Sequence, residues 1–362
     1  MHGLPFGRIH SGRMSPKIFG SLPSGEPVEA YTLTSDGGAS ARILTYGGIV
    51  SSLRVPDRSG RLDDVVLGFD DLAGYLEPHP YFGAIVGRIA GRVTRGRISA
   101  DGRDHALECN EGRNHLHGGR RGLDKRLWAA TSAQSAGGGA SLTLAYTSPD
   151  GEEGYPGALD ISVKYTLTAS NALIVETRGA SDRPTPLSLA NHSYFNLAGE
   201  GSGTVLGHEV MIPADDYVPA DGAMTLSDRR ERVEGWAADF RRPRLLGDAL
   251  PELLGSHGDF YMLRPPEAVG QQSSTLAALV SEPLSGRVLG VYTDDWCLQL
   301  YTGAMLDGTH AGKSGAPYAP FSGLCLECQG YPNASVVGGF GDIIVRPGDP
   351  QLRRTIYEFS TM

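Results

Sequence analysis

The sequence predicts an all-β fold, a single large antiparallel β-sandwich with few short helices. Short apolar runs rich in β-branched and aromatic residues follow one another along most of the chain, separated by turn residues. The 362 residues include 50 Gly and 23 Pro, scattered without a period, which is typical of many turns and therefore many strands. No long amphipathic pattern of helical period recurs, and strands do not alternate with helices. A doubly wound α/β sheet and a TIM barrel are therefore excluded.

The first third of the chain is predicted to be strand after strand. Turn sequences such as Ser35-Asp36-Gly37-Gly38 separate the apolar runs. Residues 70–76 predict one or two helical turns, and residues 97–106, with Asp101-Gly102 in their middle, predict a hairpin. The predicted strands lie at residues 28–33, 41–46, 49–55 and 64–67.

The same pattern continues to the end of the chain, with one less regular region. Residues 216–275 mix Pro, Gly and charge, and we expect loops and short helices over a sheet there. No low-complexity linker and no internal repeat interrupts the chain, so one domain over residues 1–362 is expected, with residues 1–16 as a loose extension. The later strands are predicted at residues 127–132, 141–147, 159–168, 172–177, 274–281, 287–293, 296–301, 323–328 and 355–359.

Composition excludes several classes of function. The formal charge is −9 and no long basic cluster is present, which argues against nucleic acid and anionic membrane as partners. No apolar run has the length of a spanning helix or a signal peptide, so a soluble cytoplasmic protein is expected. The 4 cysteines are too few for a disulfide scaffold. Cys325 and Cys328 would point to opposite faces of a strand, so we expect no metal site there.

Residues 322–334 hold one carboxylate, Glu327, inside a short apolar run that breaks at Gly330 and Pro332. In a strand, Cys325, Glu327 and Gln329 would share one face, and the other face would carry Leu324, Leu326 and Cys328 toward the core. Burial would raise the pKa of Glu327 from about 4.3 toward the working pH, which suits a general base. A strand-edge glutamate facing solvent is the alternative interpretation.

Residues 188–197 form a second polar cluster at the end of an apolar run. His192, Tyr194 and Asn196 would share one face. Histidine exchanges a proton near neutral pH at little cost, so His192 is a candidate acid or base. The alternative is a core histidine bonded to a backbone carbonyl.

Two further clusters carry His and Arg. His115 and His117 would lie on one face if extended, which suits a metal pair completed by His192, a sugar-binding histidine, or a structural loop. Arg88 and Arg92 would lie on the same side in a strand or a helix, where guanidinium groups fit hydroxyls or a phosphate, although surface charges are commoner. An acid and a base on a rigid β scaffold indicate proton transfer, but these residues do not name a substrate.

The chain resembles the aldose 1-epimerase (galactose mutarotase) family in seven motifs that follow one another in the family's order. The Asp150-Gly151-Glu152-Glu153-Gly154 loop is among the most recognisable of them. The seven motifs are residues 65–70 with Tyr75 and Leu76, 87–92, 114–119 with 122–125 and Trp128, 148–157, 191–197, 299–303, and 325–329 with Pro332.

This resemblance implies a galactose mutarotase-like supersandwich with an open sugar cleft, no metal and no organic cofactor. It implies interconversion of the α and β anomers of a free aldose. By the matching motifs, Glu327 would be the base at the C1 hydroxyl and His192 the acid at the ring oxygen. The resemblance further implies substrate contacts from His117, Arg92, Arg88, Tyr194, Ser193, Gln299 and Asp259.

Two departures from the family pattern touch substrate recognition. Gly91 stands where the family usually has Asn before the second Arg of its motif. His257 stands near the position of a sugar-binding Asp, and Asp259 follows two residues later. We therefore expect a preferred sugar other than galactose, or broadened specificity.

Three other functions remain as alternatives at this point. A hexose-6-phosphate 1-epimerase on the same fold would need extra cationic side chains. A non-catalytic sugar-binding protein and a metal enzyme using His115, His117 and His192 are the others. A monomer or a homodimer is expected.

Overall fold

The computed structural model describes residues 12–253, 258–263 and 274–362. Its strands pair antiparallel in every ladder between named strands, and the helices of the described part are short, so the predicted all-β class is confirmed. The helical segments are α1 (Leu72–Leu76), α2 (Leu246–Ala249), η1 (Thr94–Gly96), η2 (Leu123–Lys125), η3 (Glu152–Gly154) and η4 (Leu250–Glu252).

The largest layer is a 10-stranded sheet in the order β1-β12-β13-β14-β15-β29-β25-β24-β19-β22. It joins strands far apart in sequence, since β29 near the C-terminus lies between β15 and β25. Its strands are β1 (Gly12–Arg13), β12 (Ala129–Ala136), β13 (Gly139–Ser148), β14 (Leu159–Leu167), β15 (Ala172–Ser181), β29 (Gln351–Thr361), β25 (Arg287–Thr293), β24 (Thr275–Ser281), β19 (Glu209–Met211) and β22 (Arg244–Leu245).

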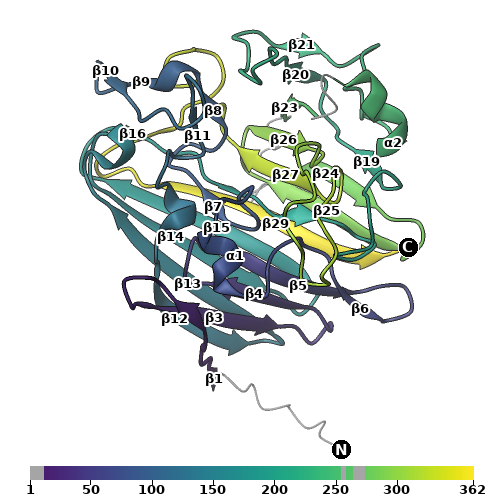
Figure 1. The fold of residues 1–362 in the computed structure, drawn as a ribbon. Helices are drawn as coiled ribbons and strands as arrows, with labels where there is room; N and C mark the ends of the chain where they lie inside the picture. Colours follow the sequence, from purple (N-terminus) through teal and green to yellow (C-terminus); the bar gives the residue numbers. More distant parts are fainter. Residues whose placement is uncertain (1–11, 254–257, 264–273) are drawn as a thin grey trace, which may run out of the picture.

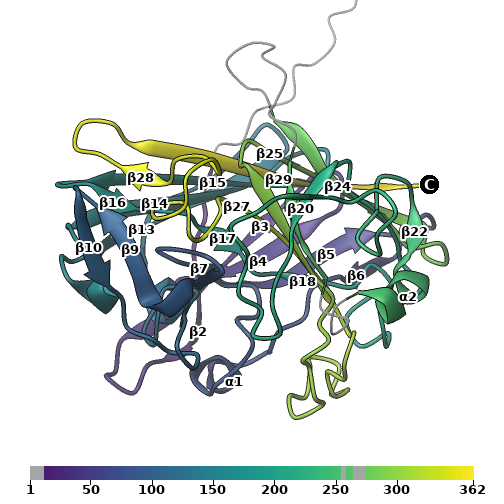
Figure 2. The same cartoon turned by 90° about the horizontal axis from the view of Figure 1, so that it is seen from above.

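A 5-stranded sheet packs against this layer and makes the sandwich (Figures 1 and 2). One continuous core holds Leu33 and Ile43 from the smaller sheet together with Leu144, Val163 and Tyr165 from the larger one. These apolar side chains alternate with more exposed ones along each strand, as a half-buried sheet requires. The smaller sheet contains β2 (Lys17–Ser21), β3 (Pro27–Thr34), β4 (Ser40–Leu44), β5 (Val50–Pro56) and β6 (Leu62–Asp64).

A 6-stranded sheet in the order β18-β27-β26-β23-β20-β21 carries the candidate site. Its strands are β18 (Tyr194–Phe195), β27 (Leu324–Gln329), β26 (Cys297–Tyr301), β23 (Phe260–Met262), β20 (Asp216–Val218) and β21 (Glu231–Arg232). The remaining ladders join β7 (Ile85–Val86) to β17 (Ala190–Asn191), β8 (Arg92–Val93) to β11 (His115–Leu116), β9 (Arg97–Ala100) to β10 (Arg103–Ala106), and β16 (Thr185–Pro186) to β28 (Ile344–Val345).

Most predicted elements have a counterpart in the structure. The hairpin at residues 97–106 is β9 and β10, and the predicted helical turn is α1, which Asp71 caps by accepting a bond from the Gly74 amide. The strand predicted at residues 64–67 is wrong in its bounds. β6 ends at Asp64, and Val66 only bridges Phe195, so these apolar residues fill the core without extending the ladder. Among the described residues, no helix is long and apolar enough to span a membrane.

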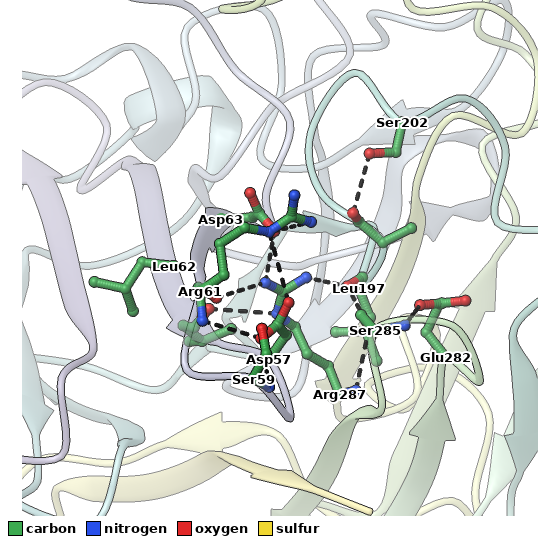
Figure 3. A network of polar contacts seen from close by, with 12 residues as sticks. Asp57, Ser59, Arg61, Leu62, Asp63, Leu197, Ser202, Glu282, Ser285 and Arg287 are labelled. Atoms are coloured by element: carbon green, nitrogen blue, oxygen red, sulfur yellow. Dashed lines mark hydrogen bonds and ion pairs between the residues drawn. The ribbon is translucent and has the colours of Figure 1, made fainter.

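Arg287 ties the two layers of the sandwich together (Figure 3). Its buried guanidinium donates to the Leu197 carbonyl at 2.9 Å, the Arg61 carbonyl at 3.1 Å and the Asp63 carboxylate at 2.7 Å. It therefore fixes the turn between β5 and β6 against β25. Removing one partner from a buried, hydrogen-bonded group of this kind strongly destabilises a protein, because the other partner is left without its contact.

Replacing Arg287 by methionine should lower the free energy of unfolding by about 3–5 kcal/mol, because the buried carbonyls of Val55 and Leu197 lose their donor, at about 1–3 kcal/mol each, and Asp63 keeps only its pair with the exposed Arg61. Urea unfolding followed by tryptophan fluorescence measures this loss. The matched control is Arg97→Met, which removes an exposed pair with Asp104 and should cost less than about 1 kcal/mol. Equal losses in the two variants would contradict the structural role given to Arg287.

Candidate active site

β27 lies between β18 and β26 in the 6-stranded sheet and presents Glu327. The predicted alternation is confirmed, since Leu324, Leu326 and Cys328 lie in the large core. On the opposite face, Glu327 and Gln329 line a cavity.

The cavity has a volume of about 470 Å³ and is open to solvent. Its floor comes from β18, β26 and β27, and its walls come from the segments around residues 80–92, 111–117, 218–226 and 258–260. A cavity of this size, mostly apolar but with a few polar groups, is typical of a small-molecule site.

Glu327 is 3% exposed, and its Oε1 lies 3.7 Å from Nε2 of His192. Its Oε2 has no hydrogen-bond partner among the described residues. Burial raises the pKa of Glu327 to about 8, against a smaller lowering by the positive charge of Arg92. The direction is the one expected from the sequence, and it gives this carboxyl group a proton affinity that suits acid–base chemistry near neutral pH.

His192 reaches Glu327 because of two strand pairings. Asn191 pairs with Ile85 on one side of it, and Tyr194 pairs with Cys325 of β27 on the other. Its ring lies against that of Tyr194, with centroids 5.1 Å apart, and its Nδ1 is 3.6 Å from Sγ of Cys325. Burial lowers the pKa of His192 to about 4. Both shifts favour a neutral imidazole beside a protonated carboxyl group in the free protein.

His117 lies on the same side of the cavity. It directly follows β11 and has φ 51°, and its Nδ1 accepts a bond from the Gly91 amide at 3.1 Å. Its ring centroid is 5.1 Å from that of His192 and 4.7 Å from that of Tyr81. Burial lowers the pKa of His117 well below its ordinary value, so the ring is neutral and suited to hydrogen bonding.

The far part of the floor contains the other predicted contacts. Gln299 sits opposite Glu327 in the β26–β27 ladder, and its Nε2 donates to the carbonyls of Leu300 at 2.6 Å and Asp259 at 3.2 Å. Asp259 lines the cavity, and burial raises its pKa to about 6. Tyr194 also lines the cavity, whereas His257 lies outside the described residues.

Arg88 does not belong to the cavity, and the expectation that it shares a side with Arg92 is wrong. Residues 87–91 form neither a strand nor a helix, and Gly91 has φ 80°, so the two side chains diverge. The buried guanidinium of Arg88 instead donates to Ser148, Thr185 and main-chain carbonyls of the 148–157 loop at 2.8–3.1 Å. It holds that loop in place.

Ser193 and His115 also point away from the cavity. Ser193 is buried between His192 and Tyr194 and, by alternation, faces the other way. His115 Nδ1 lies 2.6 Å from the Glu108 carbonyl, and its Nε2 lies 2.7 Å from the Tyr155 hydroxyl. The expected face shared by His115 and His117 is not formed, because the backbone turns at His117. A metal set that includes His115 is therefore contradicted.

A different set could hold a metal ion. The ligand atoms of His117, His192 and Glu327 all lie within 4.8 Å of one another. Two imidazoles and a carboxylate are a donor set that zinc accepts. The same three groups are also placed for proton transfer and hydrogen bonding.

Sequence reasoning missed Glu111 and Tyr81 as cavity residues. Glu111 makes a two-point ion pair with Arg92, Nε to Oε2 at 2.6 Å and Nη2 to Oε1 at 2.8 Å, and both residues line the cavity. Its position three residues before Asn114, at the edge of a recognised motif, was the available signal. Tyr81 immediately precedes the Phe82-Gly83 turn and has φ 59°, which no periodic pattern indicates.

The chain is similar to known proteins over most of its length. The family model described as aldose 1-epimerase matches residues 29–358. Galactose mutarotase of Sus scrofa is 43% identical over 346 residues, covering 95% of this chain and 97% of that protein. The Homo sapiens galactose mutarotase is 42% identical over 345 residues, covering 95% and 97%. The structure of an aldose epimerase homologue from C. elegans superposes with a TM-score of 0.82 at 28% identity, covering 92% of this chain and 99% of that one.

Proposed function

The chain belongs to the aldose 1-epimerase family and is an isomerase that interconverts the anomers of an aldose, and we propose that Glu327 and His192 carry the protons of this reaction. The observation that carries the proposal is their separation of 3.7 Å, with both side chains buried at the floor of one cavity. Acid–base catalysis needs two such groups within reach of the same substrate.

The reaction requires two proton movements. Glu327 takes the proton from the C1 hydroxyl while His192 gives one to the ring oxygen, so that the C1–O5 bond breaks and an open-chain aldehyde forms. Rotation about C1–C2 turns the other face of the aldehyde toward the C5 hydroxyl. In ring closure the C5 oxygen re-forms its bond to C1 and gives its proton to His192, and the aldehyde oxygen at C1 takes one from Glu327.

The pair therefore carries one proton throughout, on His192 before ring opening and on Glu327 after it. The raised pKa of Glu327 and the lowered pKa of His192 favour the second form in the free protein. We infer that binding the ring form moves this proton to His192. A hydrogen bond from the C1 hydroxyl would stabilise the Glu327 carboxylate and so support the transfer.

The other cavity residues would hold the sugar. His117, Arg92, Tyr194, Gln299 and Asp259 line the cavity around the pair and offer hydrogen-bonding groups to hydroxyls. Arg88 and Ser193 have no part in this proposal.

The charges of the cavity support a free aldose over a hexose 6-phosphate. Arg92 is the one lysine or arginine among the described residues that line it, and its charge is paired with Glu111. Phosphate recognition generally uses several charge-assisted bonds from cationic groups.

A cytoplasmic location and a monomeric or homodimeric state are further proposals. Free thiols at Cys109, Cys297, Cys325 and Cys328 support a reducing compartment. Size-exclusion chromatography with light scattering tests the oligomeric state.

Polarimetry on freshly dissolved α-D-galactose, α-D-glucose, D-xylose and D-arabinose tests the function and the sugar preference together. We expect faster relaxation to the unchanged final rotation. We also expect that galactose does not have a clearly higher kcat/KM than the other sugars, because Gly91 and the loop near Asp259 depart from the family pattern. Activity should survive dialysis against EDTA, since both groups act as proton carriers. No acceleration of any aldose would overturn the function, and a plain preference for galactose would overturn the expected specificity.

A further inference from the structure

We propose that Glu111 determines the charge selectivity of the cavity, restricting it to uncharged aldoses by neutralising Arg92. The inference rests on the proposed function of the cavity and concerns which sugars it admits. It assigns a role to a residue that lies outside the acid–base pair.

The pairing of Arg92 with Glu111 has the geometry of a strong, oriented ion pair. Nε and Nη2 of Arg92 face the two oxygens of Glu111 at 2.6 and 2.8 Å, the parallel two-bond arrangement that best matches guanidinium to carboxylate. The Arg92 side chain is 19% exposed and that of Glu111 35%, so solvent screens this pair less than a surface pair. The guanidinium edge that would receive an anionic group of a ligand is thereby occupied.

Local structure fixes Glu111 in this position. Residues 111 and 114 bridge each other across a short turn, with amide-to-carbonyl bonds of 3.1 and 2.9 Å in the two directions. The chain then enters β11, where Leu116 pairs with Arg92 of β8. Glu111 therefore lies beside the strand that carries its partner.

No side chain at position 91 competes for Arg92. Gly91 has φ 80°, and a Cβ there would come within 2.8 Å of Pro332 and 3.1 Å of the Gln329 amide. The backbone and the packing both favour glycine, and the polar contact beside Arg92 comes from Glu111 instead.

The remaining charges in the cavity are acidic. Among the described residues, Asp221, Asp259 and Glu327 line it together with Glu111, and Arg92 is the one lysine or arginine. Burial raises the pKa of Asp259 and Glu327, so these two carry less charge at neutral pH, whereas the carboxylate of Glu111 is held beside a guanidinium. A ligand with its own carboxylate would meet a like charge at Glu111 and no unpaired lysine or arginine among the described lining residues, which disfavours its entry.

The test compares D-galactose with D-galacturonate. At C6 galactose carries a hydroxymethyl group and galacturonate carries a carboxylate. Polarimetry gives kcat/KM for each sugar with the wild-type protein and with Glu111→Gln, which keeps the shape of the side chain and removes its charge. We expect the wild type to favour galactose strongly. The ratio of kcat/KM for galactose to kcat/KM for galacturonate should fall about tenfold or more in the variant, because the positive charge of Arg92 is then no longer compensated by Glu111.

Glu108→Gln is the matched control. It removes a carboxylate from the same segment that is also ion-paired, to Arg120 at 2.9 Å, but is 53% exposed and outside the cavity lining. In Glu108→Gln the ratio of kcat/KM for galactose to kcat/KM for galacturonate should equal that of the wild type. Raising the salt concentration with the wild type adds a measurement that needs no variant, since screening should increase galacturonate turnover relative to galactose.

The outcomes separate this inference from the function on which it rests. No acceleration of galactose by the wild type would mean that the proposed function fails. Normal galactose turnover with a ratio that is unchanged in Glu111→Gln, or equally altered in Glu108→Gln, would overturn the role of Glu111. If Glu111→Gln does not fold, the wild type alone tests the role of Glu111. Equal kcat/KM for galactose and galacturonate, or a ratio of the two that does not change with salt, would then overturn that role.

Discussion

Replacing Glu327 with glutamine should lower kcat for aldose mutarotation by about 10³-fold, because general acid–base groups of this kind typically contribute 10²–10⁴ to the rate. Glutamine fills the same space at the floor of the cavity but can neither take the C1 proton nor return one. Circular dichroism should show an unchanged fold. Glu176→Gln removes a partly exposed glutamate of β15 that is paired with Lys164 and does not line the cavity, and it should leave kcat unchanged.

The pH dependence of the wild type follows from the same assignment. The active enzyme holds one proton on the Glu327–His192 pair. As pH rises through about 8, the pKa to which burial raises Glu327, that proton is lost and kcat/KM should fall. As pH falls through about 4, the pKa of His192, the pair gains a second proton. Glu327 and His192 are then both protonated, no base remains, and kcat/KM should fall again. A rate that keeps rising well above pH 8, after subtraction of the uncatalysed reaction, would contradict the one-proton pair.

Replacing His192 with alanine should also lower kcat by about 10²–10⁴-fold, because the departing ring oxygen loses its proton donor. The substitution leaves a space beside Tyr194, Tyr81 and Cys325 that a free imidazole molecule can enter. Added imidazole should therefore restore part of kcat. Free imidazole also catalyses mutarotation in solution, so the rate without enzyme must be subtracted.

Chemical rescue separates an acid from a structural residue. The control is His105→Ala, which removes a histidine of β10 that does not line the cavity. Imidazole should not change its rate. Loss of activity in His192→Ala without any rescue, combined with a disturbed fold, would indicate that His192 supports the packing of this region and is not the acid.

The parts of the fold that follow strand alternation were predictable from sequence. The two faces of residues 324–329 separated correctly because side chains in a strand alternate with a period of two, and the period survives burial on both sides. The hairpin around Asp101-Gly102 followed from turn chemistry. The order of the 10-stranded sheet did not, because β29 pairs with β15 and β25 through contacts that no local pattern encodes.

The site was partly predictable for a similar reason. The residues around Glu327 and around His192 each indicated a functional group. That the two lie close together depends on the pairing of Tyr194 with Cys325, which are far apart in the chain. Arg88 could not be placed from sequence because its predicted side depended on a regular strand or helix, and residues 87–91 form neither. Glu111 was missed because a carboxylate in a turn is normally a solvated charge, and only the fold brings it to Arg92.

A double-substitution experiment tests the central claim, that Glu327 and His192 work as one proton-carrying pair. Polarimetry on freshly dissolved α-D-galactose and α-D-glucose would compare kcat/KM for the wild type, Glu327→Gln, His192→Ala and the protein with both changes. The account predicts that the double variant is about as slow as the slower single variant, since groups that act as a unit are not additive. A double variant slowed by the product of the two single effects, or single variants that keep wild-type rates, would contradict it.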